Sequence, residues 1–145
     1  METWSIEIRI IMELIKLGEK YKKEETRNFK KHGLTFAQHN LLCILEAGRK
    51  GQNSMTRVSG KMVTTGGNLT GIAKRLERGG LLWRKKDPLD ERKTILEIRP
   101  EGRKKLNALK LEREKSAKKL LTSLSGKKKA ELLEFLVSAQ EKLSL

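Results

Sequence analysis

The chain has 145 residues, enough for one ordinary domain with its own core, and a formal net charge of +15 at pH 7. This charge attracts polyanions such as DNA, RNA or an anionic membrane surface, while an aromatic content of only 4% disfavours a protein that stacks single-stranded bases. The single cysteine, Cys43, excludes an internal disulfide, and the charged N-terminus does not fit a signal peptide. The sequence has no apolar run of ~20 residues, which excludes a transmembrane helix. We therefore expect a cytoplasmic protein.

The first predicted element is a long amphipathic helix over residues 3–30. Trp4, Ile8, Ile11 and Ile15 follow helical spacing, and a second apolar stripe lies beside them. Together the two stripes form an apolar face that is wider than one partner helix usually needs.

Two shorter helices are predicted next. The first covers residues 35–47, where Thr35 and Gln38 fit a capping box that satisfies free backbone N–H groups. A polar, glycine-containing loop is expected over 48–53, and a short helix over 54–63.

The following segment, 64–78, is predicted to be the helix that enters the major groove of DNA. Thr64 or Thr65 is the expected cap, Gly79-Gly80 the stop, and one face is apolar. Three glycines in this region indicate either a close approach of the backbone to phosphate or, for the first two, a simple turn. The candidate DNA contacts of this helix, each of which is also explained as a solvated surface residue, are Thr65, Gly66, Asn68, Thr70, Gly71, Lys74 and Arg75.

A basic β-hairpin follows, with two short strands flanking a turn-rich loop at 87–92. Arg92 lies at the predicted tip, where a narrow minor groove attracts an arginine side chain, and Asp90 is placed to orient its guanidinium. Lys85, Lys86 and Lys93 are predicted to contact phosphates. The segment 49–104 carries 15 basic and 6 acidic residues, so the excess positive charge is concentrated around this helix and hairpin.

Two helices are predicted at the C-terminus, one over 100–122 and one capped by Ser125. The first and last helices are both amphipathic, and packing against the same helices of a second chain would bury both faces. We therefore predict a homodimer, with a monomeric helical bundle as the alternative. The expected fold is mainly α with a small β-hairpin wing, divided into an N-terminal dimerisation helix (1–33), a winged helix-turn-helix domain (34–99) and C-terminal dimerisation helices (100–145).

The order of these elements resembles the MarR family of winged-helix transcriptional regulators. The matching stretches are LTFAQ (34–38), LERGGLLWR (76–84), DPLDER (87–92) and PEG (100–102). The resemblance implies an obligate homodimer that binds pseudo-palindromic promoter DNA, represses transcription and is released by a small aromatic or phenolic anion. Tyr21, His32 and His39 fall roughly where such an effector pocket would lie, although a surface or packed histidine explains both histidines equally well. The chain departs from the family at Arg99, where threonine is common, and at the basic segment 126–129.

The leading hypothesis is therefore a sequence-specific regulator, most simply a repressor, that binds double-stranded DNA. The high charge also fits a sequence-tolerant architectural DNA-binding protein, and operator preference would separate the two. No catalytic constellation, metal-ligand cluster or cofactor motif appears, so an enzyme is not expected. We expect no membrane partner, and liposome co-sedimentation would test whether the basic ends bind a membrane surface.

Overall fold

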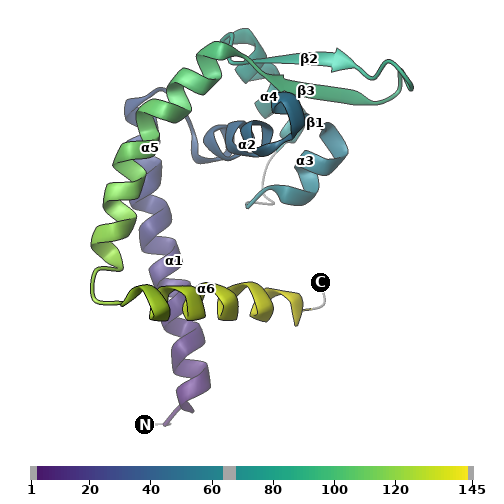
Figure 1. Ribbon diagram of the computed structural model, residues 1–145. Coiled ribbons are helices and arrows are strands. Elements are labelled where there is room, and N and C mark those ends of the chain that lie inside the picture. The colour runs from purple at the N-terminus through teal and green to yellow at the C-terminus, as the bar shows by residue number, and fades with distance from the viewer. Residues whose placement is uncertain (1–2, 64–67, 144–145) are drawn as a thin grey trace. The chain divides into compact units, whose positions relative to one another are not determined.

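The computed structural model describes residues 3–63 and 68–143, which form helices and one small antiparallel sheet (Figure 1). The chain forms two compact units, Met1–Leu109 and Lys110–Leu145. The elements in chain order are α1 (Ile6–Lys31), α2 (Phe36–Ala47), a 3-10 turn (Arg49–Gly51), β1 (Gln52–Ser54), α3 (Met55–Lys61), α4 (Leu69–Arg78), β2 (Leu82–Lys86), β3 (Thr94–Ile98), α5 (Pro100–Leu120) and α6 (Gly126–Glu141). The predicted order of helices and the predicted hairpin are thus confirmed.

Two helix starts follow from local capping, as predicted. The Thr35 hydroxyl accepts from the Gln38 N–H at 3.1 Å, and the Gln38 amide oxygen accepts from the Thr35 N–H at 3.0 Å. The Ser125 hydroxyl accepts from the Lys128 N–H at 3.2 Å at the start of α6. Because these contacts span only three residues, the local sequence is sufficient to place both helix starts.

The predicted loop over 48–53 was wrong in part, because the chain there forms the 3-10 turn and the strand β1. β1 pairs antiparallel with β3, with Gln52 opposite Glu97 and Ser54 opposite Ile95, and the strand order is β1-β3-β2. A strand of three residues is too short to show an alternating apolar pattern. Its pairing partner lies about 45 residues along the chain, so only the folded structure shows it.

The predicted cap of the recognition helix was also wrong. α4 begins at Leu69, and its cap is Asn68, whose side-chain oxygen accepts from the Gly71 N–H at 3.2 Å. Asparagine is the stronger capping residue because its amide oxygen reaches the free N–H without strain. A Cβ at Gly71 would lie 3.3 Å from the Asn68 amide nitrogen, so this glycine leaves room for the cap. The candidates Thr65 and Gly66 lie outside the described residues.

The first unit has a continuous apolar core between the sheet and the helices. α2 contacts α1, α3, α4 and β3 (Figure 1). On the hairpin, the side chains of Leu82, Leu96 and Ile98 are buried on one face. Gly102 permits a close approach of α5 to the hairpin, since a Cβ there would lie 2.5 Å from the Leu81 carbonyl oxygen. The buried apolar residues are Phe29, Leu34, Leu41, Leu42, Leu45, Val58, Ala73, Leu76, Leu81, Leu82, Leu96, Ile98 and Leu109.

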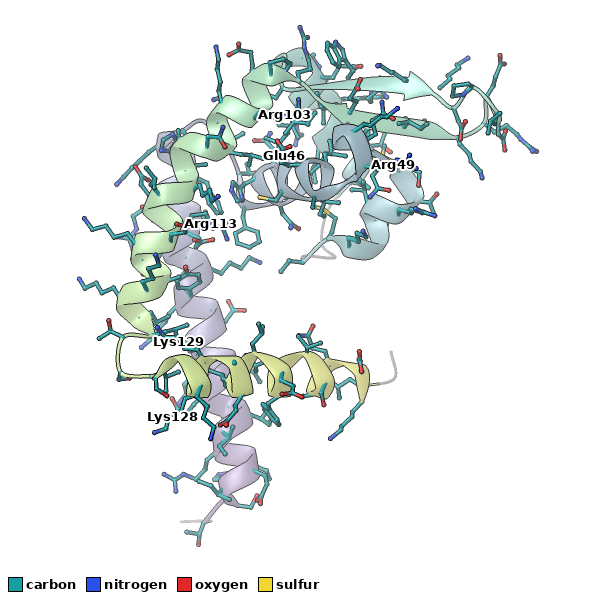
Figure 2. All side chains as sticks on the ribbon, in the orientation of Figure 1. Glu46, Arg49, Arg103, Arg113, Lys128 and Lys129 are labelled. Carbon is teal, nitrogen blue, oxygen red and sulfur yellow. The ribbon has the colours of Figure 1, made fainter. Side chains whose placement is uncertain are left out.

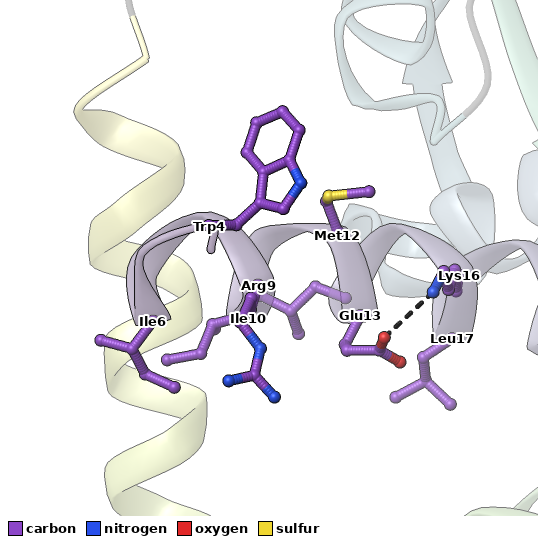
Figure 3. Close-up of a pocket in the computed structure, with 9 residues that line it drawn as sticks. Trp4, Ile6, Arg9, Ile10, Met12, Glu13, Lys16 and Leu17 are labelled. Atoms are coloured by element: carbon purple, nitrogen blue, oxygen red, sulfur yellow. Dashed lines mark hydrogen bonds and ion pairs between the residues drawn. The ribbon is translucent and has the colours of Figure 1, made fainter. Parts of the chain in front are cut away.

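Large exposed apolar side chains are most numerous on α1 in the first unit and recur on α6 in the second. The N-terminal half of α1 presents Trp4, Ile6, Ile10, Met12 and Leu17 around a shallow concavity of about 600 Å³ (Figure 3). α6 has no buried residue and exposes Leu133, Phe135 and Val137. None of the helices within the described residues is long and apolar enough to cross a membrane.

Candidate nucleic-acid interface

The recognition helix α4 has one apolar and one polar face. Ala73 and Leu76 are buried, and Leu69 and Ile72 pack against the same core. Thr70, Lys74 and Arg75 are exposed on the remaining surface, together with Arg78. A helix held by one face presents the other to a groove, and arginine, lysine and threonine side chains bind base edges or phosphates there. The exposed Asn68 retains only its amide N–H groups for such contacts, because its oxygen caps the helix.

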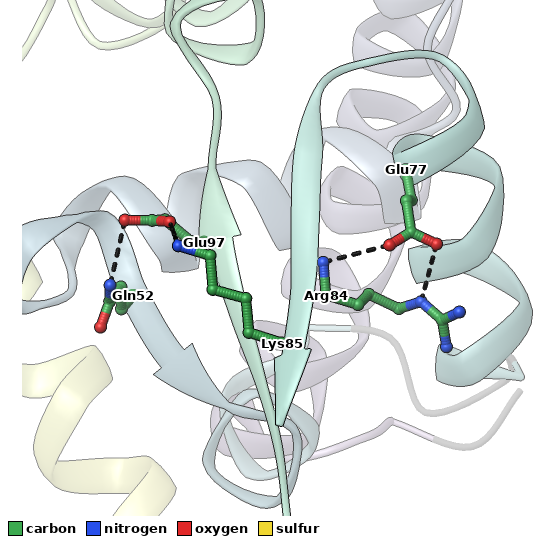
Figure 4. Close-up of polar contacts among 5 residues, drawn as sticks. All are labelled: Gln52, Glu77, Arg84, Lys85 and Glu97. Atoms are coloured by element: carbon green, nitrogen blue, oxygen red, sulfur yellow. Dashed lines mark hydrogen bonds and ion pairs between the residues drawn. The ribbon is translucent and has the colours of Figure 1, made fainter. Parts of the chain in front are cut away.

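A bidentate contact fixes the hairpin to the recognition helix. Glu77, near the end of α4, accepts from the side-chain Nε of Arg84 at 3.0 Å and from the backbone N–H of Arg84 at 3.2 Å (Figure 4). The hydrogen bond from the Arg84 side chain, supported by the Arg84 backbone N–H and the Arg84 and Lys74 charges, lowers the pKa of Glu77 despite its partial desolvation. The relative position of α4 and the wing is therefore set by a charge-assisted contact.

A second carboxylate links all three strands. Glu97 on β3 accepts from the Lys85 ammonium on β2 and from the Gln52 amide on β1, the latter at 3.0 Å (Figure 4). The hydrogen bonds from Lys85 and then Gln52 lower the pKa of Glu97. The Lys85 ammonium also lies 5.1 Å from the centre of the Trp83 ring. Lys85 was predicted to contact phosphate; its ammonium is already paired with Glu97, so a phosphate would have to compete with that carboxylate.

The tip of the wing carries the exposed arginine that the sequence predicts. The Arg92 side chain is 91% exposed, and both its Nε and its backbone N–H donate to the same Asp90 oxygen at 3.1 Å. The predicted contact between Asp90 and Arg92 is thus present. Lys86 and Lys93 are also exposed on the hairpin. A single surface ion pair adds little stability, so the contact acts chiefly on the direction of the guanidinium.

We predict that the Glu77–Arg84 contact stabilises the fold only above the pH range in which Glu77 is protonated. Because the folded state lowers the pKa of Glu77 below its usual value of 4.5, the stabilisation is present above that value and is lost as pH falls through the lower folded pKa. Glu77→Gln should lower the free energy of unfolding by about 0.5–1 kcal/mol at pH 7. Urea unfolding at pH 7 and pH 3 measures this difference, and an undiminished effect at pH 3 would contradict the assignment.

The three candidate effector residues do not form one cluster. Tyr21 and His32 lie eleven residues apart, about 16 Å along a helix axis. His39 is buried in α2, and its ring stacks on Phe29 at 4.1 Å between centroids, while the Cys43 sulfur lies 3.6 Å from its ring nitrogens. His32 ends α1, and its carbonyl accepts from the Lys105 ammonium at 2.6 Å. A packed histidine is therefore the explanation that the structure favours for His39.

Sequence analysis missed the two carboxylates that position the wing, Glu77 and Glu97. Opposite charges on either side of the Gly79-Gly80 turn were the available signal for the Glu77–Arg84 pair. For Glu97 the signal was absent, since its contact with Gln52 depends on the strand β1. Arg99, the residue that departs from the family pattern, lies 4.9 Å from the centre of the Trp83 ring. Within the described part of the chain, no group of three His, Cys, Asp or Glu side chains is placed to hold a metal ion.

Solved structures of similar fold cover the whole chain. Sco3205 of Streptomyces coelicolor, a MarR family transcriptional regulator solved in complex with DNA, superposes with a TM-score of 0.84 at 18% identity, over 100% of this chain and 92% of that chain. The fold is that of the MarR family. BldR of Sulfolobus solfataricus, a transcriptional regulator, gives a TM-score of 0.81 at 23% identity over 99% and 100% of the two chains.

A third similar structure is BpsR of Bordetella bronchiseptica, whose DNA binding is regulated by 6-hydroxynicotinic acid. It gives a TM-score of 0.79 at 19% identity over 99% of this chain and 100% of that one. No protein-family sequence profile and no curated protein matches this chain. The MarR-like winged helix is thus established by structural similarity, at identities of 18–23%.

Proposed function

We propose that this chain is a MarR-family transcriptional regulator that binds double-stranded DNA sequence-specifically. The proposal rests on one observation. The polar face of α4 and the wing tip with Arg92 are both exposed, and they belong to two elements that are in direct contact. Glu77 and Arg84 connect these elements directly. The DNA complex of the similar Sco3205 supports the same use of the fold. Thr70, Lys74, Arg75 and Arg92 are the proposed contacts, with Lys86 and Lys93 on phosphates.

The regulator acts as a homodimer in this proposal. Exposed apolar side chains gather on the N-terminal half of α1 and recur on α6. Contiguous apolar surface of this kind marks an interface on a charged protein. A second copy of the chain has the same two surfaces, so a two-fold dimer buries both and places two recognition helices one turn of DNA apart, ~34–36 Å. A pseudo-palindromic operator would match this symmetry.

Repression and release by a small aromatic or phenolic anion complete the proposal. The regulation of BpsR by 6-hydroxynicotinic acid is a precedent on the same fold. In this chain, His32 borders a surface concavity together with Lys31, Lys104 and Lys105. Glu101 also lines the concavity and pairs with Lys104 at 3.3 Å, so Lys31 and Lys105 are the cations left beside the histidine for an anionic ligand. His32 is therefore the favoured effector contact among the three candidates, ahead of Tyr21 and His39.

Fluorescence anisotropy with two duplexes tests the proposed function. One duplex carries the promoter region upstream of this protein's own gene, and the other is a scrambled sequence of the same length. A specific regulator should prefer the promoter by ~10³-fold or more, and the preference should persist near physiological salt. Equal affinity for both duplexes, lost together as salt rises, would contradict this specific role at the promoter tested.

A second candidate function, a sequence-tolerant architectural DNA-binding protein, is favoured by one observation in the second unit. Its α5 and α6 segments expose six lysines without an acidic residue between residues 115 and 130: Lys115, Lys118, Lys119, Lys127, Lys128 and Lys129. Figure 2 labels Lys128 and Lys129 at the start of α6. Lysines in the first turn of α6 oppose the helix dipole, which makes their concentration there electrostatically unfavourable without a polyanion. Under this alternative, neutralising these lysines weakens binding to every duplex equally.

A further inference from the structure

A polar groove lies beside the wing, outside the contacts assigned above. Its volume is about 360 Å³, and its lining comes from the 3-10 turn, the strand β1, the start of α3 and the loop end of the hairpin strands, at Asp87 and Ile95. Arg49, Lys50 and Arg57 contribute its positive charge, and Asp87 is its single acidic residue. Figure 2 shows Arg49 beside the sheet, at the end of α2. Two neighbouring segments, the 3-10 turn and the start of α3, thus bring three cations to one groove.

The backbone that displays Lys50 is unusual. Lys50 has φ +57°, and among the described non-glycine residues it alone has a positive φ. Glycine or asparagine adopts this left-handed conformation more easily, because a longer side chain crowds the backbone. Strained positions of this kind concentrate at functional sites. Because lysine occupies position 50 in spite of this cost, we infer that the direction of its side chain matters for function.

The charges in the groove are available to a ligand. Arg49, Lys50 and Arg57 are exposed, and none of them forms an ion pair with another described residue. The Asp87 carboxylate accepts from the Leu89 N–H at 2.9 Å, so part of its charge is used within the hairpin turn. The lining has no aromatic side chain, and Ile95 supplies its only large apolar surface. These properties suit a phosphate group rather than an aromatic anion.

We propose that Arg49, Lys50 and Arg57 form a phosphate clamp that binds the DNA backbone beside the wing. This inference rests on the proposed DNA-binding function and extends the contact surface beyond α4 and the wing tip. Phosphate contacts fix position and add affinity without sequence information. The clamp therefore contributes equally to operator and non-operator binding, and its contribution appears in the salt dependence.

The triple variant Arg49→Gln, Lys50→Asn, Arg57→Gln tests the clamp. Asparagine at position 50 keeps the left-handed backbone while removing the charge. Anisotropy across a salt series on the promoter and scrambled duplexes should show a slope of log K against log[salt] that is shallower by about 2.7 per bound protomer, since each phosphate contact contributes about 0.9. The ratio of the two affinities should stay unchanged. Thermal melting checks that the variant is folded.

The matched control neutralises three exposed cations on the C-terminal half of α1, in Lys20→Gln, Lys23→Gln, Arg27→Gln, and changes the net charge equally. For this control, the slope of log K against log[salt] should change by less than the ~0.9 expected for one phosphate contact.

Two further variants test the role of charge. Arg49→Lys with Arg57→Lys keeps both positive charges and should retain the wild-type slope. Asp87→Asn removes the acidic charge but keeps the oxygen that accepts from Leu89, and it should bind both duplexes about threefold more tightly. An equal slope change in the clamp variant and the control, or none in the clamp variant, would overturn the clamp. These readouts remain valid if the wild type shows no promoter preference, so failure of the clamp and failure of the proposed regulator are distinguishable.

Discussion

The double substitution Ile11→Asp, Ile15→Asp should convert the proposed homodimer into a monomer. Both side chains lie on α1 one helical turn apart, and they are 53% and 60% exposed in the single chain. Burying an isoleucine contributes about 1.5–3 kcal/mol to the free energy of association. Each substitution occurs twice in a two-fold interface, once in each protomer. We expect the dimer dissociation constant to rise at least a thousandfold, or about 4 kcal/mol. Sedimentation equilibrium should then give the monomer mass of 16.6 kDa.

The matched control for this prediction is Leu89→Asp. Leu89 is 95% exposed in the hairpin loop, away from the α1 surface, so this variant also replaces an exposed apolar side chain by aspartate, but without touching the proposed interface. This variant should sediment as a dimer. If the α1 variant also remained a dimer at micromolar concentration, the exposed face of α1 would not be the interface. Because both substituted isoleucines are exposed, the fold of the chain itself should persist, which circular dichroism checks.

Loss of the dimer should also remove specific DNA binding. Two recognition helices on one rigid two-fold frame bind two half-sites at once, so the second contact occurs at a high effective concentration. A monomer retains the charges of α4, the wing and the groove, and it should still bind any duplex weakly at low salt. The promoter preference of the α1 variant should therefore collapse before its non-specific affinity does.

The parts of the fold that the sequence predicts are those governed by local rules. Two helix starts are marked by capping contacts that span three residues, at Thr35 with Gln38 and at Ser125. The wing was predicted from two short strands on either side of a turn. The cap of α4 was misplaced because Thr64, Thr65 and Asn68 are all competent capping residues close together. Asparagine ranks above threonine as a cap, and the structure shows Asn68 in that position.

The site residues that sequence analysis missed depend on contacts between distant segments. Gln52 reaches Glu97 only because β1 pairs with β3, and Lys85 is occupied by that same carboxylate. The groove beside the wing combines local and distant contacts. Arg49, Lys50 and Arg57 lie within nine residues of the sequence, whereas Asp87 and Ile95 join them only because β1 pairs with β3. The local cluster of charge was therefore visible in the sequence, whereas the groove that it lines was not.

Arg92→Ala should weaken operator binding roughly ten- to a hundredfold while leaving the dimer and the stability of the fold unchanged. The side chain is almost fully exposed, and its described contact is with Asp90 in the same loop, so removing it costs the fold little. Its proposed role is insertion into a narrow minor groove, where the negative potential is strongest in A·T-rich sequence. Anisotropy on the promoter duplex and sedimentation equilibrium measure the two quantities.

Three companion measurements separate insertion from simple charge. Arg92→Lys keeps the charge but lacks the planar fork, and it should recover only part of the affinity. Replacing A·T pairs by G·C pairs at the position of the wing tip should weaken the wild type and leave Arg92→Ala unaffected. Asp90→Ala should have a smaller effect than Arg92→Ala, because it frees the guanidinium without removing it. If Arg92→Ala bound the operator as tightly as the wild type, the wing would not contact the minor groove through this residue, and DNA binding would depend on α4 and the phosphate contacts alone.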